Sequence, residues 1–134
     1  MSAGDRGDDH PARALWGEDA ARIEAALREV DPDLADLILN IAYGRVFARP
    51  GLDHRTRSLL AIAHLMHVGH EDEIRTHVRA LLRNGGSYDE AKETILHAAM
   101  FAGFPRALTA MRALARERDR EGARDDDEGG QSDP

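Results

Sequence analysis

Apolar residues recur every three or four positions along the middle of this 134-residue chain, which is the spacing of an amphipathic α-helix. No stretch of useful length alternates apolar and polar residues, so the pattern does not predict strands. Ala and Leu dominate and β-branched residues are sparse, which also favours helix. We therefore expect an all-α fold of about six helices. The expected helices are 18–30, 32–44, 54–68, 72–84, 88–103 and a last one from Pro105 that frays after Ala115.

Capping residues support several of these boundaries. Asp31, followed by proline, and Asp53 each precede an expected helix, where an N-cap carboxylate accepts a hydrogen bond from the first turn. Ser87 with Glu90 three residues later forms the sequence pattern of a capping box. Gly85 follows the helix expected to end near residue 84, as glycine commonly does.

Charge and glycine are concentrated at the two ends of the chain. We expect residues 1–13 to be a disordered N-terminal arm and residues 121–134 to be a disordered acidic tail, because neither holds much to bury. Residues 14–120 then form one helical domain. Most of the net charge of −7 lies in the tail, so this domain is close to neutral and offers no basic face for nucleic acid.

The composition also narrows the location and the chemistry. The chain has no apolar run near 18 residues and no signal-peptide pattern, so we expect a cytoplasmic protein that does not enter membranes. It has no cysteine, which excludes thiol chemistry.

The helix expected over 88–103 is apolar on two sides. A helix of this kind is normally buried on both sides, and a small chain can achieve that by association. We therefore predict a homo-oligomer. One stripe is Ala91, Ile95, Ala98 and Ala102, and the other side carries Leu96 and Met100.

Three histidines are candidate acid or base groups because imidazole titrates near neutrality. His77 lies at the edge of an apolar stripe, where it is either a core histidine or a residue of a pocket wall. His97 lies between the two apolar sides of its helix, where it is either a buried base or a polar residue that fixes an interface. His67 lies three residues after His64, which makes a metal pair conceivable, but no His-Glu-x-x-His pattern is present and we expect no metal site.

Arginines cluster around the turn that begins at residue 49. Arg49, Arg55 and Arg57 can bind a carboxylate through the planar guanidinium fork. The alternative is that they pair with Asp53 or with a helix end.

Residues from about Leu34 to Ala115 resemble the carboxymuconolactone decarboxylase family. The matching features occur in the family's order and spacing over about 80 residues. They are 49–52 (Arg-Pro-Gly-Leu), Arg57 before a Leu/Ala-rich helix, 77–81 leading into Asn84-Gly85, the Ser87–Glu90 helix start, and 102–107 (Ala-Gly-Phe-Pro-Arg-Ala).

This resemblance implies an all-helical, alkylhydroperoxidase D-like domain that assembles into rings, either trimers or hexamers. The redox branch of the superfamily uses a Cys-x-x-Cys pair, which is absent here. The other branch resembles the decarboxylase that converts γ-carboxymuconolactone to the β-ketoadipate enol-lactone without a cofactor or metal. The resemblance makes His77 the first candidate acid/base, followed by His97 and His67, with Arg49, Arg57 and Phe101 as candidates for substrate binding.

Two exchanges from the usual family pattern leave the reaction open. The chain has His97 where glutamine is usual and Phe101 where tyrosine is usual. The substrate can then be a different small carboxylate or lactone, either an aromatic or a polyketide-derived one, in aromatic compound or secondary metabolism. The alternatives are a cofactor-free enzyme for lactone opening, isomerisation or cyclisation, a non-catalytic oligomer that binds a small acid, and a histidine-rich metal protein.

Overall fold

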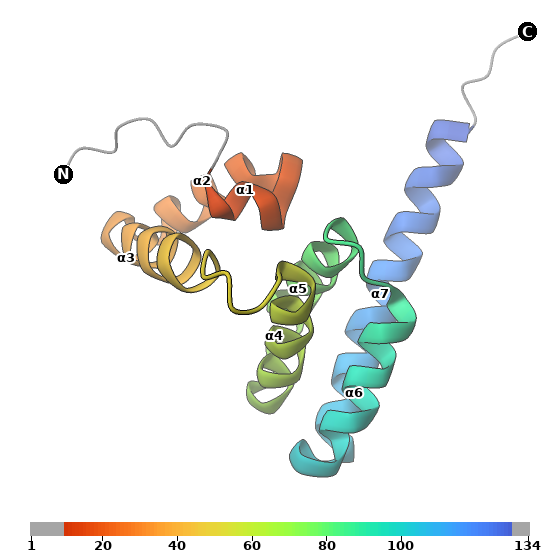
Figure 1. Ribbon diagram of the computed structural model, residues 1–134. Helices are drawn as coiled ribbons and strands as arrows, with labels where there is room; N and C mark the ends of the chain where they lie inside the picture. The colour runs from red at the N-terminus through yellow and green to blue at the C-terminus, as the bar shows by residue number, and fades with distance from the viewer. Residues whose placement is uncertain (1–9, 130–134) are drawn as a thin grey trace, which may run out of the picture.

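A computed structural model describes residues 10–129 of the chain (Figure 1), and this part confirms the predicted all-α class. Seven α-helices, one 3₁₀ turn and one π-helix make up the described residues, which contain no strand. The elements are α1 (Pro11–Trp16), η1 (Gly17–Asp19), α2 (Ala20–Val30), α3 (Pro32–Leu37), η2 (Ile38–Val46), α4 (His54–Val68), α5 (Glu71–Arg83), α6 (Tyr88–Ala102) and α7 (Phe104–Gly129).

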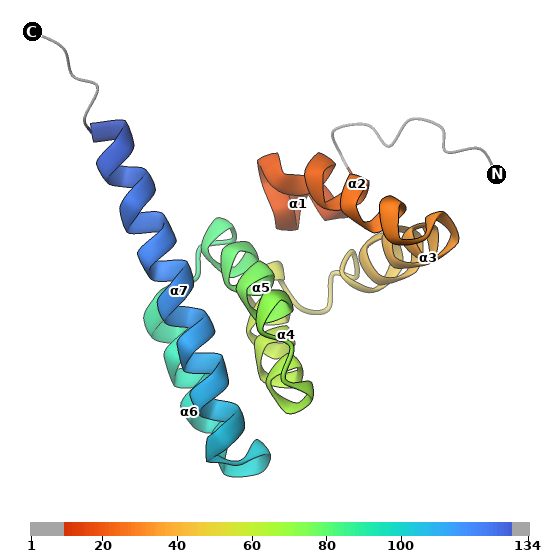
Figure 2. The ribbon, with the colours of Figure 1, turned by 180° about the vertical axis from the view of Figure 1, so that it is seen from behind.

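The helices form two groups that meet at α5 (Figures 1 and 2). Helices α4 to α7 pack as a bundle around an aliphatic core. Helix α1, the 3₁₀ turn η1, α2, α3 and η2 form a second group with its own smaller core, which includes Ala80 of α5. Helix α5 therefore contributes to both cores. The residues on the side of α5 that faces the N-terminal helix group lie at the junction of the two groups.

The predicted caps are confirmed. Asp31, Asp53 and Ser87 each accept a hydrogen bond from the backbone N–H three residues later, at 2.7, 2.7 and 3.1 Å. Gly69 and Gly85 adopt positive φ angles of 75° and 84° where α4 and α5 end, a conformation that favours glycine. These local signals fix the boundaries of α4, α5 and α6 to within a residue or two of the sequence prediction.

The last helix is longer than expected: it does not end near Ala115 but extends into the range 121–134 that was expected to be disordered. Helix α7 continues to Gly129 as a largely exposed helix beyond the bundle. The turns just beyond Ala115 are held by the bundle: the buried Glu117 pairs with Arg75 of α5 at 2.9 Å, and the Tyr88 hydroxyl of α6 donates to Glu121 at 2.9 Å. These contacts join residues 42 and 33 positions apart, so helical periodicity does not reveal them.

The N-terminal arm also differs from the expectation. Helix α1 begins at Pro11 within the range 1–13 that was expected to be disordered, and the His10 side chain caps it by accepting from the backbone N–H of Ala12. Ala12 is already buried in the smaller core, which provides the burial that the sequence pattern did not reveal. Residues 1–9 and 130–134 lie outside the described part of the chain.

The helix predicted over 32–44 is present but changes its geometry. It runs as an α-helix to Leu37 and then as a π-helix to Val46. At its end, the backbone N–H of Phe47 donates to the carbonyl of Ala42 five residues earlier, at 2.9 Å. π-Helical segments are rare and are frequent at functional sites, and this one carries Tyr43 and leads into Phe47.

None of the helices described here combines the length and the apolar character needed to cross a bilayer.

Candidate active site

His77 lies on α5 at the junction of the two helix groups. Its side chain is buried, with a relative exposure of 6%. Burial lowers the pKa of His77 from 6.5 to about 4, because the charged imidazolium loses its hydration there. His77 is therefore neutral at pH 7 and offers one ring N–H and one acceptor nitrogen.

A row of aromatic rings covers the imidazole. Phe47 stacks against His77 with ring centroids 6.1 Å apart and planes inclined by 22°. Tyr43 stacks on Phe47 at 5.1 Å, and Trp16 packs on Tyr43 at 4.2 Å. The row brings α1, η2 and the residue after η2 onto one side of α5. Burial and the charge of Glu73 raise the pKa of Tyr43, so its hydroxyl stays protonated.

Several polar atoms near this junction are buried without a hydrogen-bond partner in the described part of the chain. Nδ1 of His77 and Nε1 of Trp16 are two of them. On α4, which packs against α5, the fully buried hydroxyl of Ser58 is a third. An unsatisfied buried polar group costs about 1–3 kcal/mol and calls for an explanation. A polar ligand that hydrogen-bonds to His77 Nδ1 provides one.

The three arginines between residues 49 and 57 form different contacts. Arg57 donates from Nε to the carbonyl of Leu52 at 3.2 Å and from Nη2 to that of Arg49 at 3.1 Å, so its guanidinium braces the turn. Arg55 pairs with Glu90 of α6 at 2.5 Å. Arg49 is exposed, and in the described residues its side chain forms no ion pair. Of the three, Arg49 alone has a guanidinium that is not already committed within the described chain.

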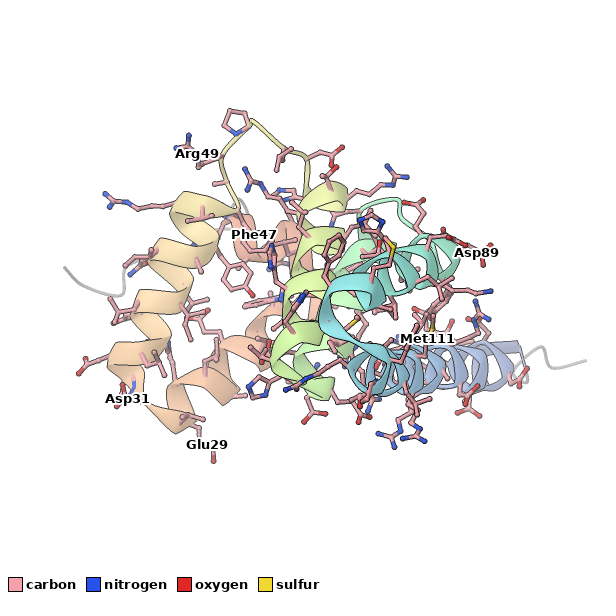
Figure 3. The ribbon with its side chains drawn as sticks, turned by 90° about the horizontal axis from the view of Figure 1, so that it is seen from below. Glu29, Asp31, Phe47, Arg49, Asp89 and Met111 are labelled. Atoms are coloured by element: carbon pink, nitrogen blue, oxygen red, sulfur yellow. The ribbon has the colours of Figure 1, made fainter. Side chains whose placement is uncertain are left out.

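Arg49 is also close to Phe47 in the sequence. Figure 3 shows both on the segment that joins η2 to α4, with Arg49 at the outer edge of the molecule. Because the bracing by Arg57 fixes the Arg49 carbonyl, it also fixes the backbone two residues beyond the ring that covers His77.

The other predicted site residues lie elsewhere. His67 is exposed, and its Nδ1 lies 2.9 Å from the carbonyl of Ala63 in its own helix. His97 is exposed on α6 and its ring packs 5.7 Å from that of Phe101, which is 72% exposed. The aromatic ring that contacts His77 is that of Phe47, not that of Phe101. A single chain thus brings His77 together with the segment of Arg49 and Arg57, but not with His67, His97 or Phe101.

No group of three or more histidine and acidic side chains that could hold a metal ion occurs between residues 10 and 129.

The aromatic row was missed in the sequence. The chain has one Trp, two Tyr and three Phe, and three of these six residues form the row. Such rarity was the available signal, but aromatic side chains are equally typical of an ordinary core. Trp16 lies 61 positions before His77, so only the packing of α1 on α5 shows that they belong to one region.

The described part of the chain is an all-helical domain with a buried neutral histidine on α5, and the sequence contains no cysteine. The model of the carboxymuconolactone decarboxylase family matches residues 32–116, and the chain belongs to this family. The match includes α3 to α6, with His77, Arg49 and Arg57, and leaves out α1 and α2.

Three relatives are similar over this region. A 4-carboxymuconolactone decarboxylase of Acinetobacter baylyi is 46% identical over 85 residues, 63% of either chain. A nitrosuccinic acid decarboxylase of Metarhizium robertsii is 37% identical over 92 residues, 66% of this chain and 64% of the relative. An uncharacterized 15.0 kDa protein of Paracoccus denitrificans is 34% identical over 101 residues, 72% of this chain and 75% of the relative. The chain thus covers less than two thirds of the length of either named decarboxylase.

Proposed function

We propose that this protein is a cofactor-free decarboxylase of a small lactone acid similar to carboxymuconolactone. The observation that carries the proposal is His77, a buried neutral imidazole whose Nδ1 has no partner in the described chain. Two relatives that are named as decarboxylases support the reaction class. His77 is assigned the role of acid/base, and Arg49 that of carboxylate binding.

Decarboxylation without a cofactor requires the electrons of the breaking C–C bond to move into a conjugated carbonyl. The substrate carboxylate leaves as CO₂, and the electron pair delocalises through the ring double bond to the lactone carbonyl oxygen. A hydrogen-bond donor at that oxygen stabilises the developing negative charge. A proton then adds to the ring carbon to complete the product.

His77 is suited to supply that proton. In the free protein its environment keeps the imidazole neutral. A bound substrate anion beside the ring raises the pKa of His77, because a nearby negative charge favours the imidazolium. The acid is therefore formed when the substrate binds. Arg49 binds a carboxylate of the substrate, and Arg57 stabilises the turn that carries Arg49.

The test is replacement of His77 by Gln. We expect kcat to fall by about 10³-fold, within the range for the loss of a general acid/base group, while the helical content stays unchanged. Loss of γ-carboxymuconolactone and release of CO₂ are measured with EDTA present. His67→Gln is the matched control, because His67 is exposed and bonds only within its helix. Equal turnover by the His77 variant and the parent would remove His77 from the mechanism.

A second substrate is favoured by one comparison. One relative, the nitrosuccinic acid decarboxylase of Metarhizium robertsii, is named for an acid that is not a lactone. Nitrosuccinic acid is therefore assayed in parallel with the lactone. If the folded protein releases CO₂ from neither acid, the result would favour the alternative functions. These are lactone opening, isomerisation or cyclisation, or binding of a small acid without turnover.

We also propose that the chain acts as a homo-oligomer, a trimer or a hexamer. The second apolar side predicted for α6 is exposed in the single chain, with Leu96 at 48% and Met100 at 70%. It continues onto α7, where Phe104 is 81% and Leu108 52% exposed. A contiguous exposed apolar surface of this kind is typical of an interaction site. Together with Ala99, Pro105, Ala107 and Met111, three of these residues line one apolar groove.

A further inference from the structure

Helix α1 lies outside the part of the chain that matches the family model, yet it is packed as firmly as a core helix. The match begins at residue 32, whereas Ala12, Leu15 and Trp16 of α1 are 5%, 0% and 3% exposed. Trp16 meets Tyr43 of η2, and these two residues belong to the smaller core together with Ala80 of α5. The packing of α1 therefore reaches the helix that carries His77.

Polar contacts fix the position of this N-terminal segment on α5. The Asn84 side chain donates from Nδ2 to the carbonyl of Ala14 in α1, at 3.2 Å. Arg83 forms an ion pair with Asp19 of η1, at 2.7 Å. These contacts lie on either side of Trp16 in the sequence, so the indole is fixed relative to α5.

The ring of Phe47, which stacks against His77, has no comparable polar contact to fix its position. Phe47 follows the π-helix and is half-buried, with a stacking partner on each side, Tyr43 and His77. Its backbone N–H bonds to Ala42 at the end of η2. The place of the phenyl ring thus depends on Tyr43, and that of Tyr43 on Trp16.

We propose that Phe47 is a positioning residue for His77: seated through Tyr43 by Trp16 of α1, its ring orients the imidazole and keeps water from it. Helix α1 then acts on the proton equilibrium of the site from outside the segment that matches the family model. The consequence for turnover rests on the proposed function. The consequence for the titration of His77 does not.

Phe47 acts on His77 through desolvation of the imidazole, as the groups around His77 indicate. Phe47, the residue after η2, faces His77, Tyr43 of η2 packs behind Phe47, and Trp16 of α1 packs on Tyr43. Glu73 lies one turn before His77 on α5, and its charge acts on Tyr43. For His77 itself, burial is the cause of the lowered pKa. Removing the phenyl ring should therefore let water in and raise the pKa toward its ordinary value of 6.5.

The experiment is a pH titration of the imidazole C–H resonances by NMR on the full chain, with His77→Gln used to assign the His77 signal. We expect the midpoint of His77 to lie near 4 in the parent and to rise by more than one pH unit in Phe47→Ala. Phe47→Leu keeps an apolar cover of smaller area and should give a smaller rise. Trp16→Leu should also raise the midpoint, through the loss of support for Tyr43.

Phe101→Ala is the matched control, because Phe101 also lies beside a histidine but on the exposed face of α6. It should leave the His77 midpoint unchanged. A folded Phe47→Ala or Phe47→Leu variant that melts earlier but keeps the parent midpoint would show that Phe47 is only structural, and would overturn the proposal. If Phe47→Ala does not fold, the Phe47→Leu midpoint decides alone.

A kinetic readout separates this proposal from the proposed function. If the protein decarboxylates the lactone acid with His77 as proton donor, the alkaline limb of kcat/KM, where free His77 loses its proton, should move upward in Phe47→Leu together with the NMR midpoint, since kcat/KM reports the free enzyme. If neither acid is decarboxylated, the proposed function fails while the NMR titration still tests Phe47.

Discussion

At the scale of single residues, His77 is kept neutral by burial without an acidic partner. A histidine with a neighbouring carboxylate would be charged at neutral pH, whereas here burial alone moves its pKa to about 4. The imidazole has low exposure, the ring of Phe47 stacks against it, and its Nδ1 has no partner in the described residues. This burial makes the stability of the protein depend on pH.

The pKa of His77 is lower in the folded than in the unfolded protein, so the unfolded state binds more protons as the pH falls below about 6.5. The contribution of His77 to the free energy of unfolding is therefore fully present above pH 6.5 and is lost progressively as the pH falls to about 4. The total contribution is on the order of 3 kcal/mol, at about 1.4 kcal/mol per pH unit.

This dependence is checked by urea unfolding between pH 4 and pH 7. We expect His77→Leu to lose less free energy of unfolding than the parent over this range, because it has no proton to gain at that position. His67→Leu should follow the parent, since His67 is exposed. Parallel curves for the parent and His77→Leu would contradict the assignment of a buried neutral histidine.

At the scale of elements, α6 shows how one helix serves two purposes. Its first stripe, with Ala91, Ile95 and Ala98 at 0%, 0% and 4% exposure, closes the core of the bundle. Its second side, with Leu96 and Met100, stays exposed beside Phe104 of α7. The exchange at Phe101 therefore lies on the exposed face and not at His77, so we associate it with assembly rather than with the substrate contact of a single chain.

Phe104→Glu tests the assembly. A charge in the middle of the exposed apolar face should be costly to bury between subunits, so we expect a smaller species than the parent in sedimentation velocity, with unchanged helical content. Ala25→Glu introduces the same residue at an exposed position of α2, in the other helix group, and should leave the assembly intact. A parent that is already a monomer at micromolar concentration would refute the oligomer proposal.

At the scale of the whole molecule, one buried carboxylate joins the bundle helices and, through an arginine, the N-terminal group. Glu117 of α7 is 0% exposed. Arg75 lies 2.9 Å and Arg79 3.1 Å from its carboxylate oxygens, and Arg120 lies 3.1 Å away on α7 itself. Burial alone would raise the pKa of Glu117, but the hydrogen bonds from Arg75 and Arg120 lower it on balance. Arg79 also reaches Asp19 of η1 at 4.0 Å.

We expect Glu117→Gln to lower the free energy of unfolding by about 2 kcal/mol. Removing one partner of a fully buried pair costs about 3–5 kcal/mol, and the arginines here keep part of their surface in water, which reduces the cost. Chemical unfolding at pH 7 measures it, with the exposed Glu93→Gln as control. A loss equal to that of Glu93→Gln would show that the cluster adds nothing to stability.

The sequence by itself determined the helices and much of their ends, because these depend on residues only three or four positions apart. The caps at Asp31, Asp53 and Ser87 are of this kind. It also indicated His77 as the leading histidine and α6 as a helix with two apolar sides. It failed for α7 beyond Ala115, where side chains of α5 and α6 hold Glu117 and Glu121 through contacts distant in sequence.

Only the tertiary structure decided how the site is built. The contact of Phe47 with His77 joins residues 30 positions apart, and the support from Trp16 comes from another helix group. Three nearby arginines look alike in the sequence, but only packing shows that Arg57 braces a turn and Arg55 pairs with Glu90. The physical reason is that burial and desolvation depend on which surfaces the folded chain brings together, and helical periodicity carries no information about that.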